Sequence, residues 1–185
     1  MIKIPSLRIT TVFILLSLAL NIHANEYEDA VDNWDSYQDV ANWLNDNFKF
    51  SKQRQELIKE RLQLHGPEGL LIRDPKKTFI NSNGYCADAA YFARESLNTI
   101  DPEYNAQWVF IDNAINGPNH WVTGFYVDGD LYIMDYGAGN KWGDMQGTHG
   151  PYKSLDEYKA FLSSLNMPGF EVKEVRWREM PGKED

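Results

Sequence analysis

Residues 120–136 read HWVTGFYVDGDLYIMDY, and this stretch decides how the chain is expected to fold. The runs 120–127 and 131–136 are rich in β-branched and aromatic residues, which favour strands. Between the two runs stands Asp128-Gly129, a dipeptide typical of a two-residue β-turn. The stretch therefore predicts an antiparallel β-hairpin.

The register of this hairpin brings two polar side chains together. If Asp128-Gly129 is a two-residue turn, Asp135 lies opposite Val122. Side chains alternate along a strand, so positions 120 and 122 share a face. His120 and Asp135 are then diagonal neighbours on one face, with roughly 7–8 Å between their backbones, a gap that long polar side chains can bridge. The register thus predicts a carboxylate that holds one ring nitrogen of His120.

Hydrophobic periodicity predicts further elements on both sides of the hairpin. They are two helices between residues 32 and 64 that break near 50–51, a helix at 155–165, and strands at 107–112 and 171–178, the last of which closes the sheet. The segments 66–84 and 137–150 are rich in glycine and turn residues, so loops are expected there. A connection as long as 66–84 usually has a functional role.

A helix is also expected at residues 86–98, because small apolar residues recur there at helical spacing. Ser82 or Asn83 can cap its start. Cys86, the one cysteine of the chain, stands in the first turn, where free N–H groups and the helix dipole favour a thiolate. A buried small apolar residue is the alternative role of an isolated cysteine. With one cysteine no internal disulfide can form.

The N-terminus has the layout of a secretory signal peptide. Residues 1–24 contain Lys3 and Arg8, followed by an apolar run at 12–20. A membrane-spanning helix needs roughly 20 apolar residues, so this run is too short to span. We therefore expect cleavage and export, to the periplasm or the outside of the cell, with an uncleaved N-terminal anchor as the alternative. Residues 25–185 have the size of a single domain.

The charge of the chain limits its partners. It has 18 Lys+Arg against 27 Asp+Glu, a net charge of −9, and loss of two basic residues with the signal peptide leaves −11. Nucleic acids and anionic membranes require a basic surface. After signal cleavage we expect a monomer that binds neither nucleic acid nor membrane.

Three segments together resemble the transglutaminase-like superfamily of cysteine peptidases and acyltransferases. They are Asn83-Gly84-Tyr85-Cys86 before a small-residue helix, Asn119-His120-Trp121-Val122 at the start of a strand, and Leu131-Tyr132-Ile133-Met134-Asp135 on the next strand. The order Cys, His, Asp and the spacing of 15 residues between His and Asp match the family's pattern. The resemblance covers residues 70–140.

This resemblance implies a papain-like α+β fold, in which N-terminal helices and the cysteine-bearing helix pack on an antiparallel sheet. It implies thioester acyl-enzyme chemistry, with Cys86 as nucleophile, His120 as general base and acid, and Asp135 as orienter. The oxyanion donors are expected to be the backbone N–H of Cys86 and a preceding side chain, Asn81 or Asn83. For both asparagines a capping or turn role is the alternative.

Two residues of the glycine-rich segment are candidates for substrate contact. Trp142 and His149 follow the second strand of the hairpin, and loops in that position carry specificity on a rigid scaffold. No second His or Cys stands at ligand spacing from His149, and no twelve-residue calcium loop is present. We expect no metal and no cofactor.

The expected function is that of an exported cysteine-dependent hydrolase, a peptidase or amidase that acts on a protein or peptide through one transglutaminase-like catalytic domain at residues 25–185. A transglutaminase-type acyltransferase would use the same residues, and the sequence does not separate the two. A catalytically silent papain-like module that binds a peptide is the third alternative. The presence of Cys86, His120 and Asp135 argues against that alternative.

Overall fold

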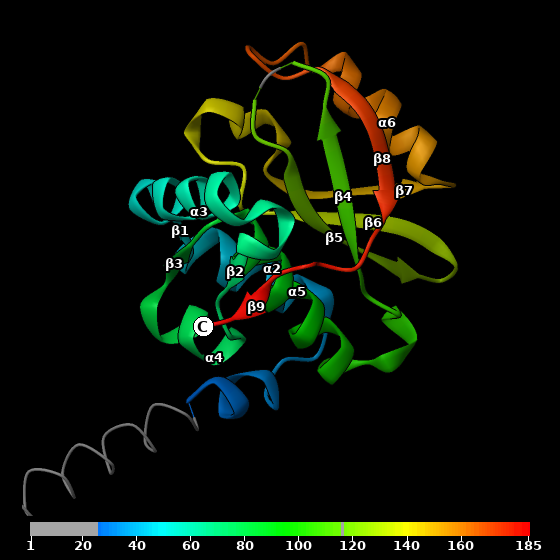
Figure 1. Cartoon of the computed structure of the whole chain (residues 1–185). Helices are drawn as coiled ribbons and strands as arrows, with labels where there is room; N and C mark the ends of the chain where they lie inside the picture. The colour runs from blue at the N-terminus through cyan, green and yellow to red at the C-terminus, as the bar shows by residue number, and fades with distance from the viewer. Residues whose placement is uncertain (1–25, 116) are drawn as a thin grey trace, which may run out of the picture.

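An antiparallel sheet forms the centre of the computed structural model, which describes residues 26–115 and 117–185 (Figure 1). Its strands run in the order β7-β6-β5-β4-β8. They are β4 (Gln107–Asn113), β5 (His120–Val127), β6 (Asp130–Asp135), β7 (Gly147–Tyr152) and β8 (Val172–Trp177). In the β5–β6 hairpin Val127 pairs with Asp130, and Thr123 with Met134, which confirms the register predicted from the turn.

Helices cover both faces of this sheet. They are α2 (Tyr37–Asn47), α3 (Lys52–His65), α4 (Pro75–Asn81), α5 (Cys86–Ile100) and α6 (Leu155–Ser164), with short 3-10 helices η1 (Gly66–Gly69), η2 (Pro102–Tyr104) and η3 (Asn140–Met145). Two small parallel pairs connect distant segments: β1 (Lys49–Phe50) with β3 (Asn83–Gly84), and β2 (Leu71–Ile72) with β9 (Lys183–Glu184).

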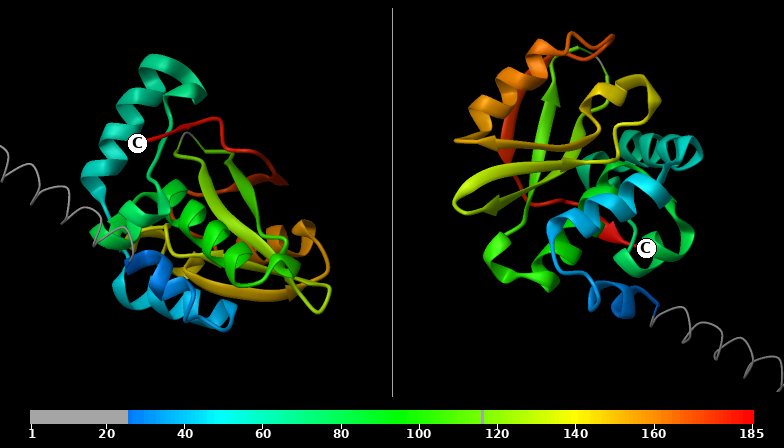
Figure 2. Two further views of the ribbon diagram at one scale, coloured as in Figure 1. Left: turned by 90° about the horizontal axis from the view of Figure 1, so that it is seen from below. Right: turned by 180° about the vertical axis from the view of Figure 1, so that it is seen from behind.

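Side-chain alternation along the strands assigns one helix to each face of the sheet. Phe125 and Met134 point into a cluster with α5 and α2, whereas Val122 and Ile133 point into a second cluster with α6. Figure 2 shows α5 and α6 on opposite sides of the sheet. The predicted α+β class, with helices packed on an antiparallel sheet, is confirmed.

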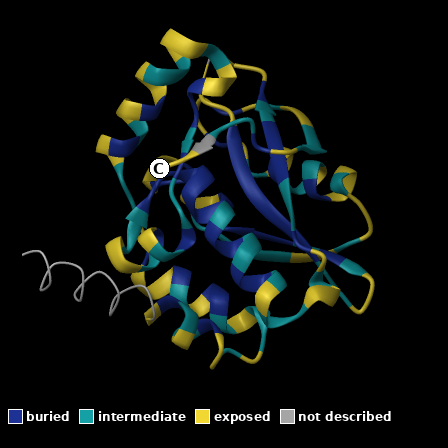
Figure 3. Ribbon diagram, turned by 60° about the horizontal axis from the view of Figure 1, so that its bottom comes forward, coloured by how far each residue is buried: buried dark blue, intermediate teal, exposed yellow. Residues whose placement is uncertain are grey.

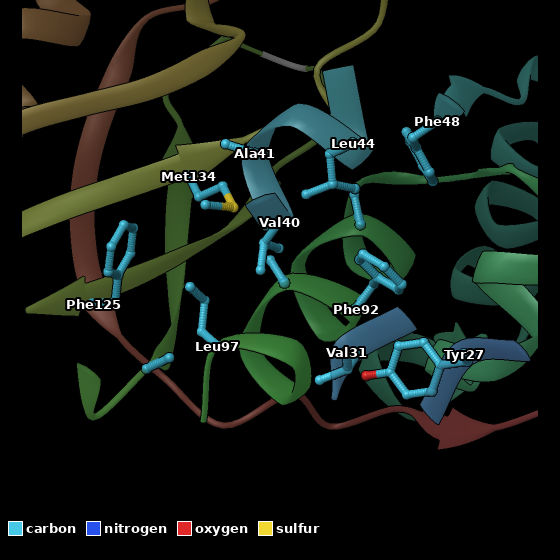
Figure 4. Close-up of a cluster of buried hydrophobic side chains, with 13 residues drawn as sticks. Tyr27, Val31, Val40, Ala41, Leu44, Phe48, Phe92, Leu97, Phe125 and Met134 are labelled. Carbon is cyan, nitrogen blue, oxygen red and sulfur yellow. The ribbon is translucent and has the colours of Figure 1, made fainter. Parts of the chain in front are cut away.

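Helix α5 lies close to the sheet because its inner face consists of small residues. Ala89, Ala90 and Ala93 are buried there, and the Thr123 hydroxyl donates a 2.7 Å hydrogen bond to the carbonyl of Ala90. Phe92, on the side that faces α2, is fully buried in the cluster drawn in Figure 4. In Figure 3 α5 is largely buried, while the surrounding helices expose their outer faces. The N-terminus of α5 is therefore held by packing along the whole helix.

Both segments predicted as loops contain regular structure. In 66–84 the helix α4 begins where the Asp74 carboxylate accepts from the N–H of Lys76, with Pro75 at the first helical position. This start signal outweighs the loop-like composition of the segment. In 137–150 the structure has η3 and the first residues of β7, whose glycine and proline content is that of an edge strand.

The predicted cap of the cysteine-bearing helix was wrong. Neither Ser82 nor Asn83 caps α5; the N-cap residue is Tyr85, and its N–H donates to the carboxylate of Asp88, 2.8 Å away. Ser82 instead ends α4 in a left-handed conformation. A carboxylate at the third helical position satisfies the N–H of the N-cap residue, which is the half of a capping box that this position supplies.

The signal peptide predicted at residues 1–24 lies outside the described residues. Across residues 26–115 and 117–185 there is no helix with the length and apolar character needed to cross a membrane.

Candidate active site

Cys86 is the first residue of α5, and its side chain lies among buried neighbours with 2% of the residue exposed. The N–H groups of this first turn have no acceptors within the helix and, with the helix dipole, favour a negative charge. Gly137, which follows β6, passes so close that a Cβ at this position would stand 2.5 Å from the Cα of Cys86. Only a glycine allows the segment after β6 to meet the start of α5.

His120 and Asp135 form a buried pair beside this thiol. The Nε2 atom of His120 lies 2.7 Å from Oδ2 of Asp135, and Oδ1 of Asp135 accepts from the N–H of Gly137. The two residues are 2% and 1% exposed. The thiol of Cys86 lies close enough to the same imidazole to affect its pKa. Because Nε2 is engaged by Asp135, Nδ1 is the ring nitrogen left for the sulfur.

The surroundings of His120 determine its protonation. Burial lowers the pKa of the imidazole, but the charge of Asp135, the hydrogen bond to it and the contact with Cys86 raise that pKa, to about 10. The ring is then an imidazolium at neutral pH. The sulfur of Cys86 therefore lies beside a cation.

Trp142 packs against the imidazole of His120 and lines neither of the two surface hollows beside Tyr85. Its ring meets that of His120 edge to face, with 6.3 Å between centroids, and is buried against Phe170. Its Nε1 donates to the carbonyl of Pro168. The sequence predicted that Trp142 lines a substrate cleft, whereas η3 places its side chain in the buried cluster on the α6 side of the sheet. Trp142 therefore fixes the ring plane of His120.

His149 is not brought to the cysteine. It lies in β7 opposite Ile133, its Nε2 is 2.7 Å from the carbonyl oxygen of Met145, and its ring packs on Phe161 of α6. These contacts belong to the α6 side of the sheet. The segment predicted as a flexible loop is a strand, which fixes His149 in a structural position.

Asn81 and Asn83 have the turn role that was the alternative for them. Asn81 donates to the carbonyl of Lys77, and Asn83 donates to the carbonyl of Asn81. The side-chain oxygen of Asn83 accepts from Arg73. Both amides are thus committed to the connection between α4 and β3, which leaves the backbone N–H of Cys86 as the remaining candidate for an oxyanion donor.

A buried carboxylate that the sequence analysis missed organises the start of α5. Asp88 is fully buried and accepts from the guanidinium of Arg54, from the N–H of Arg73 and from the N–H of Tyr85. Arg54 is also buried and reaches Asp185 with its other nitrogen atoms. Burial lowers the pKa of Arg54, and the bonds to the two carboxylates raise it above its ordinary value. The acidic residue at the third position of α5 is the signal that could have revealed Asp88; nothing local in the sequence marks Arg54.

Tyr85, the residue before Cys86, lines two hollows on the surface. It lines one of about 290 Å³ and another of about 550 Å³, which also share Leu62 and Pro118. Burial and the neighbouring Cys86 raise the pKa of its phenol far above the ordinary value. The two hollows share these three residues and are together called the groove. A molecule in the groove contacts Tyr85, the residue that precedes Cys86 in the chain.

We expect Asp88→Asn to destabilise the protein, because the substitution leaves the guanidinium of Arg54 buried with less compensation. Loss of one partner of a buried ion pair costs roughly 3–5 kcal/mol, and the remaining contact with Asp185 places the effect near 3 kcal/mol. Urea unfolding measures the change. Glu56→Gln, which removes an exposed ion pair with Lys59, is the control and should change the free energy of unfolding by less than about 1 kcal/mol. Equal effects of the two substitutions would contradict the role of Asp88.

The raised pKa of His120 makes stability depend on pH. A group whose pKa is higher in the folded state stabilises the fold below its unfolded value, and this contribution disappears as the pH rises through the folded value. The free energy of unfolding should therefore fall between pH 6.5 and about 10. In His120→Gln the fall should be smaller, by an amount on the order of a few kcal/mol. Parallel profiles of the two proteins in urea unfolding would show that His120 is not the group responsible.

Comparison with known proteins identifies the family. The model of a family described as a transglutaminase-like domain matches residues 18–140, a range that contains Cys86, His120 and Asp135. No curated protein matches the chain. A solved structure titled "Crystal structure of a TGase" is similar, with 12% sequence identity, a TM-score of 0.38, and coverage of 89% of this chain and 48% of that chain. The chain thus spans about half the length of that structure. The family match confirms the resemblance seen in the three sequence segments: the chain belongs to the family of transglutaminase-like domains.

Proposed function

We propose that the protein is a cysteine-dependent hydrolase that cleaves an amide bond of a protein or peptide through a thioester. Cys86 is the nucleophile, His120 the general base and acid, and Asp135 the orienter. We further propose that the enzyme acts after export, as the N-terminal sequence predicts. Membership of the transglutaminase-like family supports acyl-transfer chemistry at a cysteine.

One observation carries the proposal: His120 stands between the carboxylate of Asp135 and the thiol of Cys86, at the start of a helix. Asp135 engages Nε2, so the ring is held with its other nitrogen towards the sulfur. This is the relation of nucleophile, base and orienter that activates a thiol. A cysteine serving only as a small core residue would need neither the imidazole nor the carboxylate.

The residues of the chain account for each step of the reaction. The thiolate of Cys86 attacks the acyl carbon and forms a C–S bond, while the first-turn N–H groups of α5 stabilise the oxygen that becomes negative. The imidazolium of His120 gives its Nδ1 proton to the leaving amine as the C–N bond breaks. Water then attacks the thioester, returns a proton to His120 and releases the acid, which restores the thiolate.

Acyl transfer to an amine would use the same residues, and the acceptor alone separates it from hydrolysis. Incubation with a glutamine-containing protein and monodansylcadaverine distinguishes the two reactions. Hydrolysis yields the free acid and leaves the protein without fluorescence, whereas transfer couples the amine to the protein. Covalent fluorescence equal to the amount of ester or amide consumed would replace our hydrolase proposal with that of an acyltransferase.

We expect alkylation of Cys86 by iodoacetamide to persist below about pH 7 in the wild-type protein, because a thiolate–imidazolium pair remains nucleophilic there. In His120→Ala the profile should shift to higher pH. His149→Ala is the matched control, since its imidazole contacts Met145 and Phe161 and should leave the profile unchanged. An unreactive thiol at neutral pH, or a profile indifferent to His120, would mean that the three residues do not work together.

Cys86→Ala should abolish turnover while the protein still folds, because the change removes the nucleophile and only a sulfur atom from the helix start. Hydrolysis of p-nitrophenyl acetate, with a burst of one p-nitrophenol per protein, is the measurement. Asp135→Asn should retain partial activity, since an orienter usually matters less than the nucleophile. Near-wild-type turnover in Cys86→Ala would end the hydrolase hypothesis.

A further inference from the structure

The smaller hollow is bounded on one side by α3, η1 and Leu70, and on the other by β4, the start of β5 and the segment after β8. Its volume of about 290 Å³ is near the lower end of the range in which small-molecule and side-chain pockets fall. Tyr85, which precedes Cys86, lines it, as do Asn119 and Trp121, which flank His120. A group bound in this hollow therefore contacts residues that are adjacent in the chain to Cys86 and to His120.

The walls of the hollow are mostly apolar. Leu62, Leu70, Phe110, Trp121 and three prolines line it. Phe110 and Trp121 pack on each other with 4.8 Å between ring centroids, so this wall is a continuous aromatic surface. Such a hollow fits an aliphatic or aromatic side chain.

A single charged residue, Arg178, lines this hollow. Its guanidinium lies over the ring of Phe110, 4.7 Å from the centroid, and within 5.8 Å of that of Trp121. Within the part of the chain that the structure describes, no carboxylate lies within ion-pair distance of it. By contrast, Arg176 also stacks on Phe110 but pairs with Glu174. Arg178 is thus a cation fixed on an apolar wall, in a chain with a net charge of −9.

We propose that this hollow binds an apolar residue that bears a free carboxylate, as at the C-terminus of a peptide, with the side chain against Phe110 and Trp121 and the carboxylate on Arg178. An arginine held flat on aromatic rings presents its planar donors to a carboxylate and binds it with two hydrogen bonds. The inference rests on the proposed function, because it assigns a substrate class to the groove beside Cys86. In this assignment the enzyme cleaves the amide bond that joins the C-terminal apolar residue to the rest of the substrate.

The test compares N-acetyl-phenylalanine with N-acetyl-phenylalaninamide, which differ only in the carboxylate. Calorimetric titration of Cys86→Ala protein, which needs no catalysis, should show that the acid binds about tenfold tighter or more. In Arg178→Gln the preference should disappear, and in Arg178→Lys part of it should return. Arg176→Gln is the matched control and should keep the full preference, because its guanidinium stacks on the same ring outside the hollow.

Protection of Cys86 from iodoacetamide supplies a second readout in the wild-type protein. The acid should slow alkylation at lower concentration than the amide. Equal binding of acid and amide, or a preference that survives Arg178→Gln, would overturn the inference. An Arg178-dependent preference in calorimetry together with a thiol indifferent to His120 would support the carboxylate site and reject the hydrolase proposal, so the two failures are distinguishable.

Discussion

The buried carboxylate of Asp88 is the interaction on which the rest of this structure depends. It accepts from the guanidinium of Arg54 in α3, from the N–H of Arg73 after β2, and from the N–H of Tyr85 at the start of α5. Burial of a carboxylate costs folding free energy unless its oxygens accept hydrogen bonds. The folded protein therefore requires these three segments to stay together around Asp88. The first turn of α5, and Cys86 with it, is positioned by this requirement.

The same arrangement places one wall of the groove beside Tyr85, at the start of α5. The bond from Arg54 fixes α3, whose Leu62 lines both hollows, against the start of α5. The other wall comes from β4, β5 and Arg178 after β8. Two arginines of this acidic chain differ in their partners: Arg54 is neutralised by Asp88 and Asp185, whereas among residues 26–115 and 117–185 no carboxylate lies within ion-pair distance of Arg178.

Local patterns were sufficient for the hairpin and for the helix that carries the cysteine. The Asp128-Gly129 turn specified the register of β5 and β6, and with it the meeting of His120 and Asp135, because a two-residue turn leaves one pairing. The elements β7 and α4 were not predicted. Glycine and proline make up half of β7, whose regularity comes from pairing with β6, and α4 is a helix of 7 residues inside a loop-like segment, where its start depends on the Asp74 cap.

The sequence by itself indicated Cys86, His120 and Asp135 as the candidate site residues and determined that His120 and Asp135 share a face of the hairpin, because turn type and side-chain alternation act over short distances. Only the tertiary structure decided what surrounds them. The partnership of Arg54 with Asp88, 34 positions apart, and the contact of Gly137 with Cys86 depend on how α3, α5 and the sheet pack. Burial and long-range ion pairing are properties of the assembled chain, and no local pattern encodes them.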